Sequence, residues 1–274
     1  MQSGEAPFFV VSAPRSGSTL LRLILDAHPQ LAVPPPGWLF DLIYPYLYSY
    51  GDVRQPANLL ALAEDMLSTP TVGKWPVKLA PAELVGAAPE PSFAGLYAAL
   101  HARYAEAGGK RRWGEKTPRN SFWIDEIKTL FPDAQFIHIV RDGRDQAIDI
   151  SDSVLWPYSV YSGASLWQRY VNAVRVSAAR LPVGAFLEIR YEDLCAAPGT
   201  TVRELCSFLR EDYDPRMLAP GAKEARMEQA RIVTPWRRGL RDAFGRQLII
   251  EILEAHGARR VCKEAATVSN RDPC

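Results

Sequence analysis

The sequence predicts a three-layer α/β fold in which helices flank a central, mostly parallel sheet. Strand-like and helix-like segments alternate along its 274 residues, as they do in parallel α/β domains. Residues 134–140, read AQFIHIV, form an almost wholly apolar run that suits a strand covered on both faces. Near the start, an apolar run at 8–11 passes through a glycine-containing loop into a helix with apolar periodicity.

In chain order, we expect strands at 8–12, 112–116, 134–140 and 185–191. Helices are expected from about 20 to 27 and at 58–67, 93–107, 120–130, 144–153, 165–180, 198–209 and 246–256. His28-Pro29 ends the first helix, and the three prolines at 34–36 exclude regular structure because they lack N–H donors and fix the backbone. An aromatic-rich segment, 38–50, then supplies either core packing or an apolar surface for a ligand. Residues 264–274 are expected to form a loose tail.

Size and composition favour one large domain spanning 1–274. A net charge of +1 gives no general attraction to nucleic acid or membranes, so any anion site must be local. We find no apolar run long enough to span a membrane and no secretory signal, and we therefore expect a cytoplasmic protein. Its four cysteines lack metal-type spacing, so no metal site is expected. Whether the chain forms a homodimer is left open.

The loop at 12–19, SAPRSGST, predicts an anion pocket. Backbone N–H groups and the positive end of the following helix dipole point at one site in such a strand–loop–helix unit. Arg15 adds a planar donor fork, and Ser16, Ser18 and Thr19 add hydroxyl groups. Because Gly17 is followed by serine rather than by Lys-Ser/Thr, the loop is not of the Walker A type. It suits a phosphate or sulfate donor; the alternative is an ordinary turn with a surface arginine.

Two further segments carry charge near the expected carboxyl ends of strands, where ligands bind in open parallel sheets. The strand at 134–140 is followed by the basic loop 141–145, RDGRD, and together with the first loop it would clasp a ligand with two anionic groups. Lys116, beside Glu115, is either aimed at the reacting group or part of a solvated ion pair. Surface ion pairs are the alternative for both segments. Near the C-terminus, Trp236, Arg237 and Arg238 suit base stacking and phosphate binding, or form a surface turn.

Three segments in order, PRSGSTLLRLILDAHP, FIHIVRDGRD and IRYEDLCAAPGTTVRELCSFL, resemble the sulfotransferases that use 3'-phosphoadenosine 5'-phosphosulfate (PAPS). The tetrapeptide EKTP at 115–118 is similar to the bacterial and tyrosylprotein branch. The resemblance extends from about residue 8 to about residue 240 and implies a P-loop-like fold with PAPS as cofactor and no metal. Residues 36–108 match poorly, and we predict that they form an insert that determines acceptor specificity.

The resemblance also implies residue roles. The 5'-phosphosulfate would be held by Arg15, Ser16, Gly17, Ser18 and Thr19, and the 3'-phosphate by Arg141. Lys116 would stabilise charge on the bridging oxygen, and with Arg15 it is a candidate catalytic cation. A C-terminal cofactor clasp would consist of Trp236, Arg237 and Arg238, whereas Tyr191 and Glu192 would be structural.

Two positions depart from the family pattern. Eight residues after the phosphate-binding arginine the family has a serine, but this chain has Asp149, whose carboxylate would repel phosphate. Either Asp149 lies at the 3'-phosphate in an altered pocket, or the helix is shifted and Ser151 or Ser153 substitutes. The segment after His28-Pro29 lacks the glutamate that deprotonates the acceptor, and Pro118 stands where another branch has a histidine. The general base is therefore open among four candidates, with Glu115 first because it adjoins the candidate lysine: Glu115, Asp41, His28 and His138.

The resulting hypothesis is in-line transfer of a sulfuryl group from PAPS to a hydroxyl or amine of a small-molecule acceptor. Such a reaction gains mainly from positioning and charge stabilisation, and an acidic acceptor would need a base least. Two alternatives remain: a catalytically decayed module that binds PAPS or another nucleotide, and a P-loop-like small-molecule kinase.

Overall fold

A five-stranded parallel sheet organises the part of the chain that the computed structural model describes, residues 6–151 and 159–219. Its strands follow the spatial order β2-β3-β1-β4-β5, and each neighbouring pair is parallel. Their bounds are β1 (Phe8–Val11), β2 (Leu31–Ala32), β3 (Arg112–Lys116), β4 (Gln135–Val140) and β5 (Phe186–Arg190). The expected α/β architecture is thus confirmed, and the described sheet is parallel throughout.

Helices fill the connections between the strands. The α-helices are α1 (Ser18–Asp26), α2 (Leu39–Leu42), α3 (Pro56–Ser68), α4 (Pro81–Ala87), α5 (Phe93–Ala107), α6 (Ile124–Leu130), α7 (Gly143–Ser151), α8 (Val160–Ala178), α9 (Tyr191–Ala196) and α10 (Pro198–Leu209). Short 3-10 helices are η1 (Tyr44–Tyr50), η2 (Val72–Lys74), η3 (Pro118–Phe122) and η4 (Pro215–Met217). No helix within the described ranges has the length and apolar character needed to cross a membrane.

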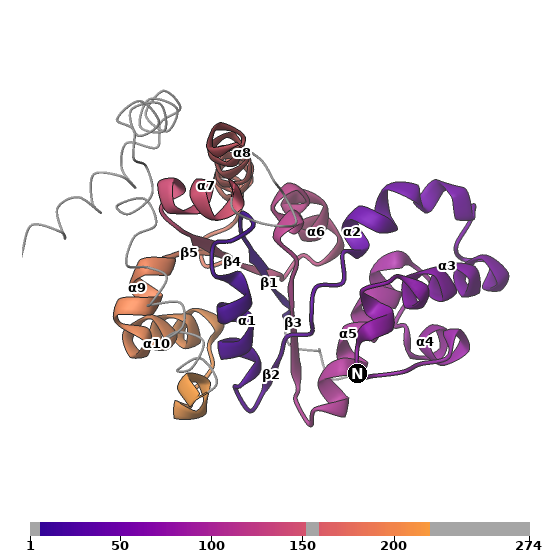
Figure 1. Cartoon of the computed structure of the whole chain (residues 1–274). Helices are drawn as coiled ribbons and strands as arrows, with labels where there is room; N and C mark the ends of the chain where they lie inside the picture. Colours follow the sequence, from indigo (N-terminus) through magenta and orange to yellow (C-terminus); the bar gives the residue numbers. More distant parts are fainter. Residues whose placement is uncertain (1–5, 152–158, 220–274) are drawn as a thin grey trace, which may run out of the picture.

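Alternate strand residues supply two hydrophobic layers, one on each face of the sheet. Phe9 and Phe136 belong to the cluster that contains buried side chains of α5, α6 and α8. Val10 and Ile137 belong to the opposite cluster, which contains side chains of α1, α9 and α10. Figure 1 shows α1, α9 and α10 together on one side of the sheet. Strands β1 and β4 are buried on both faces, and their sequences accordingly read as nearly continuous apolar runs.

Residues 36–108 fold into α2 to α5 with two of the 3-10 helices, beside β3 (Figure 1). Tyr97 of α5 packs on Trp113 of β3 with ring centroids 6.0 Å apart, so part of this segment belongs to the core. The aromatic segment within it divides between two environments. Phe40 is fully buried, whereas Tyr46 and Tyr48 are 55% and 80% exposed.

The structure corrects several expected boundaries. The helix expected at 120–130 begins only at Ile124, because the chain first forms η3 and Asn120 turns its side chain inward to Glu115. Helix α8 starts at Val160, five residues earlier than expected. Four short elements were not predicted: β2, α2, α4 and α9. The expected helix at 246–256 and the tail at 264–274 lie outside the described residues.

Candidate active site

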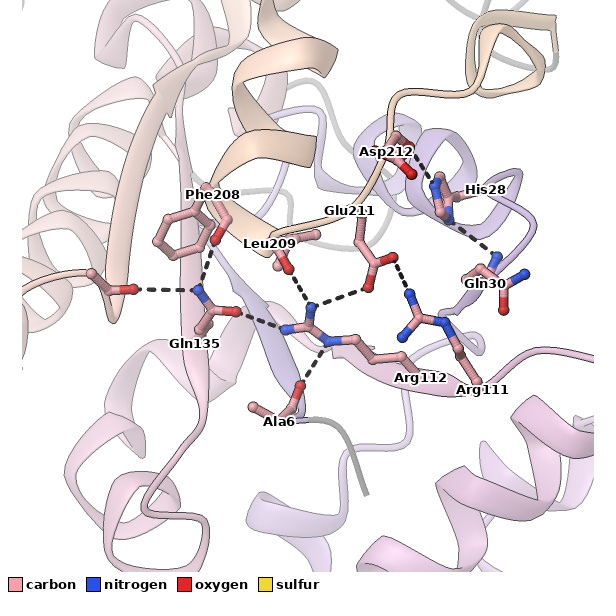
Figure 2. A network of polar contacts seen from close by, with 11 residues as sticks. Ala6, His28, Gln30, Arg111, Arg112, Gln135, Phe208, Leu209, Glu211 and Asp212 are labelled. Atoms are coloured by element: carbon pink, nitrogen blue, oxygen red, sulfur yellow. Dashed lines mark hydrogen bonds and ion pairs between the residues drawn. The ribbon is translucent and has the colours of Figure 1, made fainter. Parts of the chain in front are cut away.

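Two cavities lie near opposite edges of the sheet. The polar groups around the larger one are hydrogen-bonded to one another. That cavity, of about 520 Å³, borders the amino ends of β3 and β4. Arg112 donates from Nε to the carbonyl of Ala6 at 2.7 Å, from Nη1 to that of Leu209 at 2.6 Å, and from Nη2 to Gln135 Oε1 at 2.7 Å (Figure 2). Glu211 accepts from Arg111 at 2.6 Å. This cluster therefore ties the amino edge together.

The smaller cavity, of about 200 Å³, lies at the carboxyl edge, where β1, β3 and β4 end. It brings together three cationic side chains from separate parts of the sequence, Arg15, Lys116 and Arg141. Its lining residues are Pro14, Arg15, Gly17, Ser18, Thr19, Leu20, Lys116, Pro118, Arg141 and Asp149. The predicted convergence of the two basic loops and the lysine is thus present in the fold. We take this cavity as the candidate active site because its cations face a common space.

The β1–α1 loop turns sharply and opens the N-terminus of α1 toward this cavity. Gly17 is the N-cap residue with φ 86°, and Arg15 also has a positive φ of 68°. Among the described residues, no side chain caps α1, and its first turn holds no acidic residue. The first backbone N–H groups of α1 therefore remain as donors for an anion, and the helix dipole favours negative charge there.

Neighbouring elements hold this loop in shape. A Cβ atom on Gly17 would overlap the ring of Tyr191, which is fully buried at the end of β5. Gln146 of α7 donates from Nε2 to the carbonyl of Pro14. Ser16, in contrast with the hydroxyl role expected for it, donates its Oγ to the carbonyl of Ala13 at 2.7 Å and is not among the residues that line the cavity. Ser18 and Thr19 do line it.

Arg141 lies against the loop and is paired with a carboxylate. Its Nη1 donates to the carbonyl of Arg15 at 3.0 Å and to Asp149 Oδ2 at 2.5 Å, and its guanidinium lies 5.1 Å from the centre of the Tyr191 ring. Only 3% of Arg141 is exposed, and its Nη2 has no hydrogen-bond partner within the described ranges. Burial acts to lower the pKa of Arg141, but the charge of Asp149 and the hydrogen bond to it raise that pKa overall.

The serines considered as substitutes for Asp149 do not take its place. Ser151 donates its hydroxyl to the carbonyl of Ile148 at 2.8 Å and does not line the cavity. Ser153, like Trp236, Arg237 and Arg238 of the expected cofactor clasp, lies outside the described residues. At the carboxyl end of α7, the group facing Arg141 is therefore the Asp149 carboxylate.

Lys116 ends β3 and is buried beside the anion loop, with Nζ 3.5 Å from Thr19 Oγ1. Burial lowers the pKa of Lys116 to about 8, although the charge of Glu115 acts in the opposite direction. The side chain is thus mostly protonated near neutral pH and loses its charge as the pH rises through 8. A cation in this state can donate a proton or a hydrogen bond to an oxygen that gains charge during a reaction.

Glu115 points to the other face of the sheet. It pairs in register with Phe9, whereas Lys116 pairs with Val10, and these two partners belong to different hydrophobic layers. Thr117 Oγ1 donates to one carboxylate oxygen of Glu115 at 2.5 Å, and Asn120 donates to the other. Burial raises the pKa of Glu115 to about 7, against the lowering effects of the Thr117 hydrogen bond and of the Lys116 charge.

The other base candidates are placed differently. His28 contacts the carbonyl of Asp212 and the amide of Gln30 near the amino-edge cluster (Figure 2). His138 is buried beside Glu188, and burial lowers its pKa. Asp41 Oδ1 accepts from Arg119 Nε at 2.9 Å and from Trp123 at 3.2 Å, while its Oδ2 has no partner among the residues that the structure describes.

Of the side chains that support the site from behind, sequence reasoning named one and missed another. Tyr191, which was expected to be structural, contacts both the loop and Arg141. Trp167 of α8 donates its Nε1 to the carbonyl of Arg141 at 3.0 Å. One signal was present for Tyr191: it directly follows β5 and so lies at the same carboxyl edge as Arg15 and Arg141. Nothing in the spacing pointed to Trp167.

Comparisons with known proteins agree with this architecture. The model of the "Sulfotransferase family" matches residues 7–215. Nodulation protein NoeE of Sinorhizobium fredii is 31% identical over 137 residues, which cover 49% of this chain but only 28% of NoeE. A protein-tyrosine sulfotransferase-like protein of Caenorhabditis briggsae is 23% identical over 221 residues, which cover 78% of this chain and 69% of that protein.

Solved structures include the sulfotransferase domain of the Synechococcus PCC 7002 olefin synthase. It is 25% identical with a TM-score of 0.57, and the match covers 80% of this chain and 78% of that domain. The sulfotransferase domain from the curacin biosynthetic pathway matches with a TM-score of 0.55 at 20% identity, over 80% of this chain and 78% of that domain, and supports the fold.

Proposed function

This chain is an enzyme of the sulfotransferase family, and from that premise we propose that it transfers a sulfuryl group from PAPS to a hydroxyl or amine of a small-molecule acceptor. The observation that carries the proposal is the convergence of Arg15, Lys116 and Arg141 on one cavity at the carboxyl edge of the sheet. Three cations with an uncapped helix N-terminus form a site for a ligand with several anionic groups.

In this proposal, the donor's 5'-phosphosulfate binds the N–H groups of α1 with Ser18, Thr19 and Arg15 around it. The adenosine end extends toward Arg141. The acceptor oxygen or nitrogen attacks sulfur in line, the bond from sulfur to the bridging oxygen breaks, and that oxygen leaves with the bonding electrons on adenosine 3',5'-bisphosphate (PAP). Lys116 donates to the departing oxygen, and the proton of the acceptor passes to a base or to water.

The geometry supports a positioning role for Glu115 rather than proton abstraction. Both of its oxygens already accept hydrogen bonds, and it faces away from Lys116. Of the four base candidates we favour Asp41, because its Oδ2 has no partner among the described residues, although Asp41 is not one of the residues that line the cavity. A phenolic acceptor, which ionises readily, would depend least on this base.

A catalytically decayed binding module remains the second candidate. The lining of the cavity favours it. Among the described residues that line the cavity, Asp149 is the only one with a carboxylate, it is already paired with Arg141, and none is a histidine. This module would bind the cofactor and transfer nothing. The kinase alternative has no comparable support, because the loop lacks the lysine that reaches the terminal phosphates of a nucleoside triphosphate.

The test combines calorimetric binding of PAP with transfer of labelled sulfate from PAPS to a panel of alcohols, phenols and amines. We expect Lys116→Ala to lower kcat by about 10²–10³ with little change in PAP affinity, the usual effect of removing one transition-state donor. Lys128→Ala, at the other edge of the sheet, is the matched control. Micromolar PAP binding without transfer to any acceptor would favour the decayed module, and a protein that binds neither PAP nor its 3'-dephosphorylated form would refute both.

A further inference from the structure

The candidate active site contains a carboxylate where an all-cationic pocket would suit a polyanion better. Asp149 Oδ2 and the Arg15 carbonyl both bind Nη1 of Arg141 and so use both of its hydrogens. The Nη2 atom is buried and has no partner in the described part of the chain, so it is the guanidinium nitrogen that remains to be satisfied. Arg141 and Asp149 both line the cavity, so both groups border the space that a ligand would occupy.

An arginine–aspartate pair is complementary to a hydroxyl group. The hydroxyl oxygen can accept from Nη2, and the hydroxyl hydrogen can be donated to the carboxylate. A phosphate offers only acceptor oxygens near neutral pH, and its charge is repelled by the same carboxylate. Dinucleotide-binding folds make this distinction at the ribose, where an acidic residue binds a hydroxyl and an arginine accommodates a phosphate.

We infer that Asp149 determines donor specificity, adapting the pocket to a ribose hydroxyl at the 3' position, so that the enzyme uses adenosine 5'-phosphosulfate (APS) at least as well as PAPS. This inference rests on the proposed sulfuryl transfer and refines its donor. With APS, the acceptor attacks the same sulfur, the same bridging bond breaks, and the leaving group is adenosine 5'-monophosphate (AMP) in place of PAP.

The ion pair with Arg141 holds Asp149 in its position. The guanidinium is 3% exposed, and removal of its carboxylate partner would leave a buried charge with less compensation. A 3'-phosphate would have to displace Asp149 from Arg141 or accept its repulsion. Either event offsets the gain from the new phosphate–arginine contact, whereas a hydroxyl leaves the ion pair intact.

The experiment measures calorimetric affinities of the full chain for AMP and for PAP, with and without Asp149→Ser. We expect the wild-type protein to bind AMP at least as tightly as PAP. The serine variant should shift the ratio of the two affinities toward PAP by about tenfold or more, the usual size of a charged hydrogen-bond effect. Asp149→Asn keeps an oxygen for Arg141 and should shift the ratio in the same direction if the serine variant fails to fold. Asp133→Ser, an exposed position by the amino-edge cavity, should leave the ratio unchanged.

Sulfate transfer from APS and from PAPS to one phenolic acceptor provides the second readout. The inference predicts that kcat/KM for APS equals or exceeds that for PAPS in the wild type and that the order reverses in Asp149→Ser. A wild-type protein that prefers PAP and PAPS by tenfold or more would overturn the inference and leave sulfuryl transfer standing. A protein that binds neither nucleotide would overturn both.

Discussion

Substitution of Glu115 by glutamine tests whether the buried carboxyl group of Glu115 holds a proton in the folded protein. Glu115 is 1% exposed, and burial raises its pKa from 4.5 to about 7. Glutamine has the same size and can still accept from Thr117. Asn120 can turn its amide toward the new NH₂ group, because its Oδ1 has no hydrogen-bond partner among the described residues.

The sign of the expected effect follows from proton binding. Between pH 4.5 and about 7, the folded protein holds a proton on Glu115 that the unfolded chain has lost. The free energy of unfolding therefore falls as the pH rises through this window. A pKa rise from 4.5 to about 7 corresponds to about 3 kcal/mol, of which roughly 2–3 kcal/mol develops between pH 5 and 8.

Urea unfolding of wild type and Glu115→Gln at a series of pH values from 5 to 8 measures this directly. We expect the variant to gain stability relative to wild type as the pH rises, by roughly 2–3 kcal/mol over the series. Glu64→Gln, at an exposed position of α3, controls for the loss of one carboxylate from the chain. A difference between wild type and Glu115→Gln that stays constant with pH would refute the assignment of a buried proton to Glu115.

Three further outcomes are expected. Gly17→Ala should weaken PAP binding more than tenfold and lower the melting temperature, because the new Cβ would overlap the Tyr191 ring. Gly184→Ala is the control in the same calorimetric and thermal assays: Gly184 has a φ of 83°, but an added Cβ would meet no atom within 4 Å, so this variant measures the cost of the backbone conformation alone. Sulfate transfer to an alcohol should decline above pH 8 as Lys116 loses its proton, and a pH–rate profile of Lys116→Arg should lack that decline if the assignment holds. Arg112→Met should lower the free energy of unfolding by about 3 kcal/mol in urea titrations while PAP affinity stays unchanged.

The sheet and its ligand-binding edge could be predicted because apolar runs are long and parallel strands share one direction. The rule that ligands bind at carboxyl ends predicts that the loops with Arg15 and Arg141 share one crevice, and the family resemblance adds Lys116 to it. Short elements escaped prediction: the two residues of β2 carry no periodicity, and α9 follows β5 without a break. Neighbouring residues of a strand face opposite sides of a sheet, and the register with β1 shows that Glu115 and Lys116 do so, which counts against Glu115 as the base.

Contacts between distant segments could not be predicted in the same way. The approach of Gly17 to Tyr191 joins residues far apart in sequence, and spacing within either segment says nothing about it. Asp149 could be recognised as unusual from its position, but its pairing with Arg141 depends on the rotation of α7 about its axis. A shift of the α7 sequence by two residues would have placed Ser151 opposite Arg141, and the local sequence does not determine how α7 is rotated about its axis.

The two cavities differ in how fully their polar groups are paired, and this difference assigns function better than size does. At the amino edge, all three guanidinium nitrogens of Arg112 donate to protein oxygens, which makes that edge rigid and leaves a ligand little to gain. At the carboxyl edge, Arg141 keeps a buried nitrogen without a partner and α1 begins without a side-chain cap in the described structure. Unpaired buried donors destabilise a fold, and a bound anion at this edge would satisfy both the Arg141 nitrogen and the first N–H groups of α1. The 200 Å³ cavity is therefore the stronger candidate, although the other measures 520 Å³.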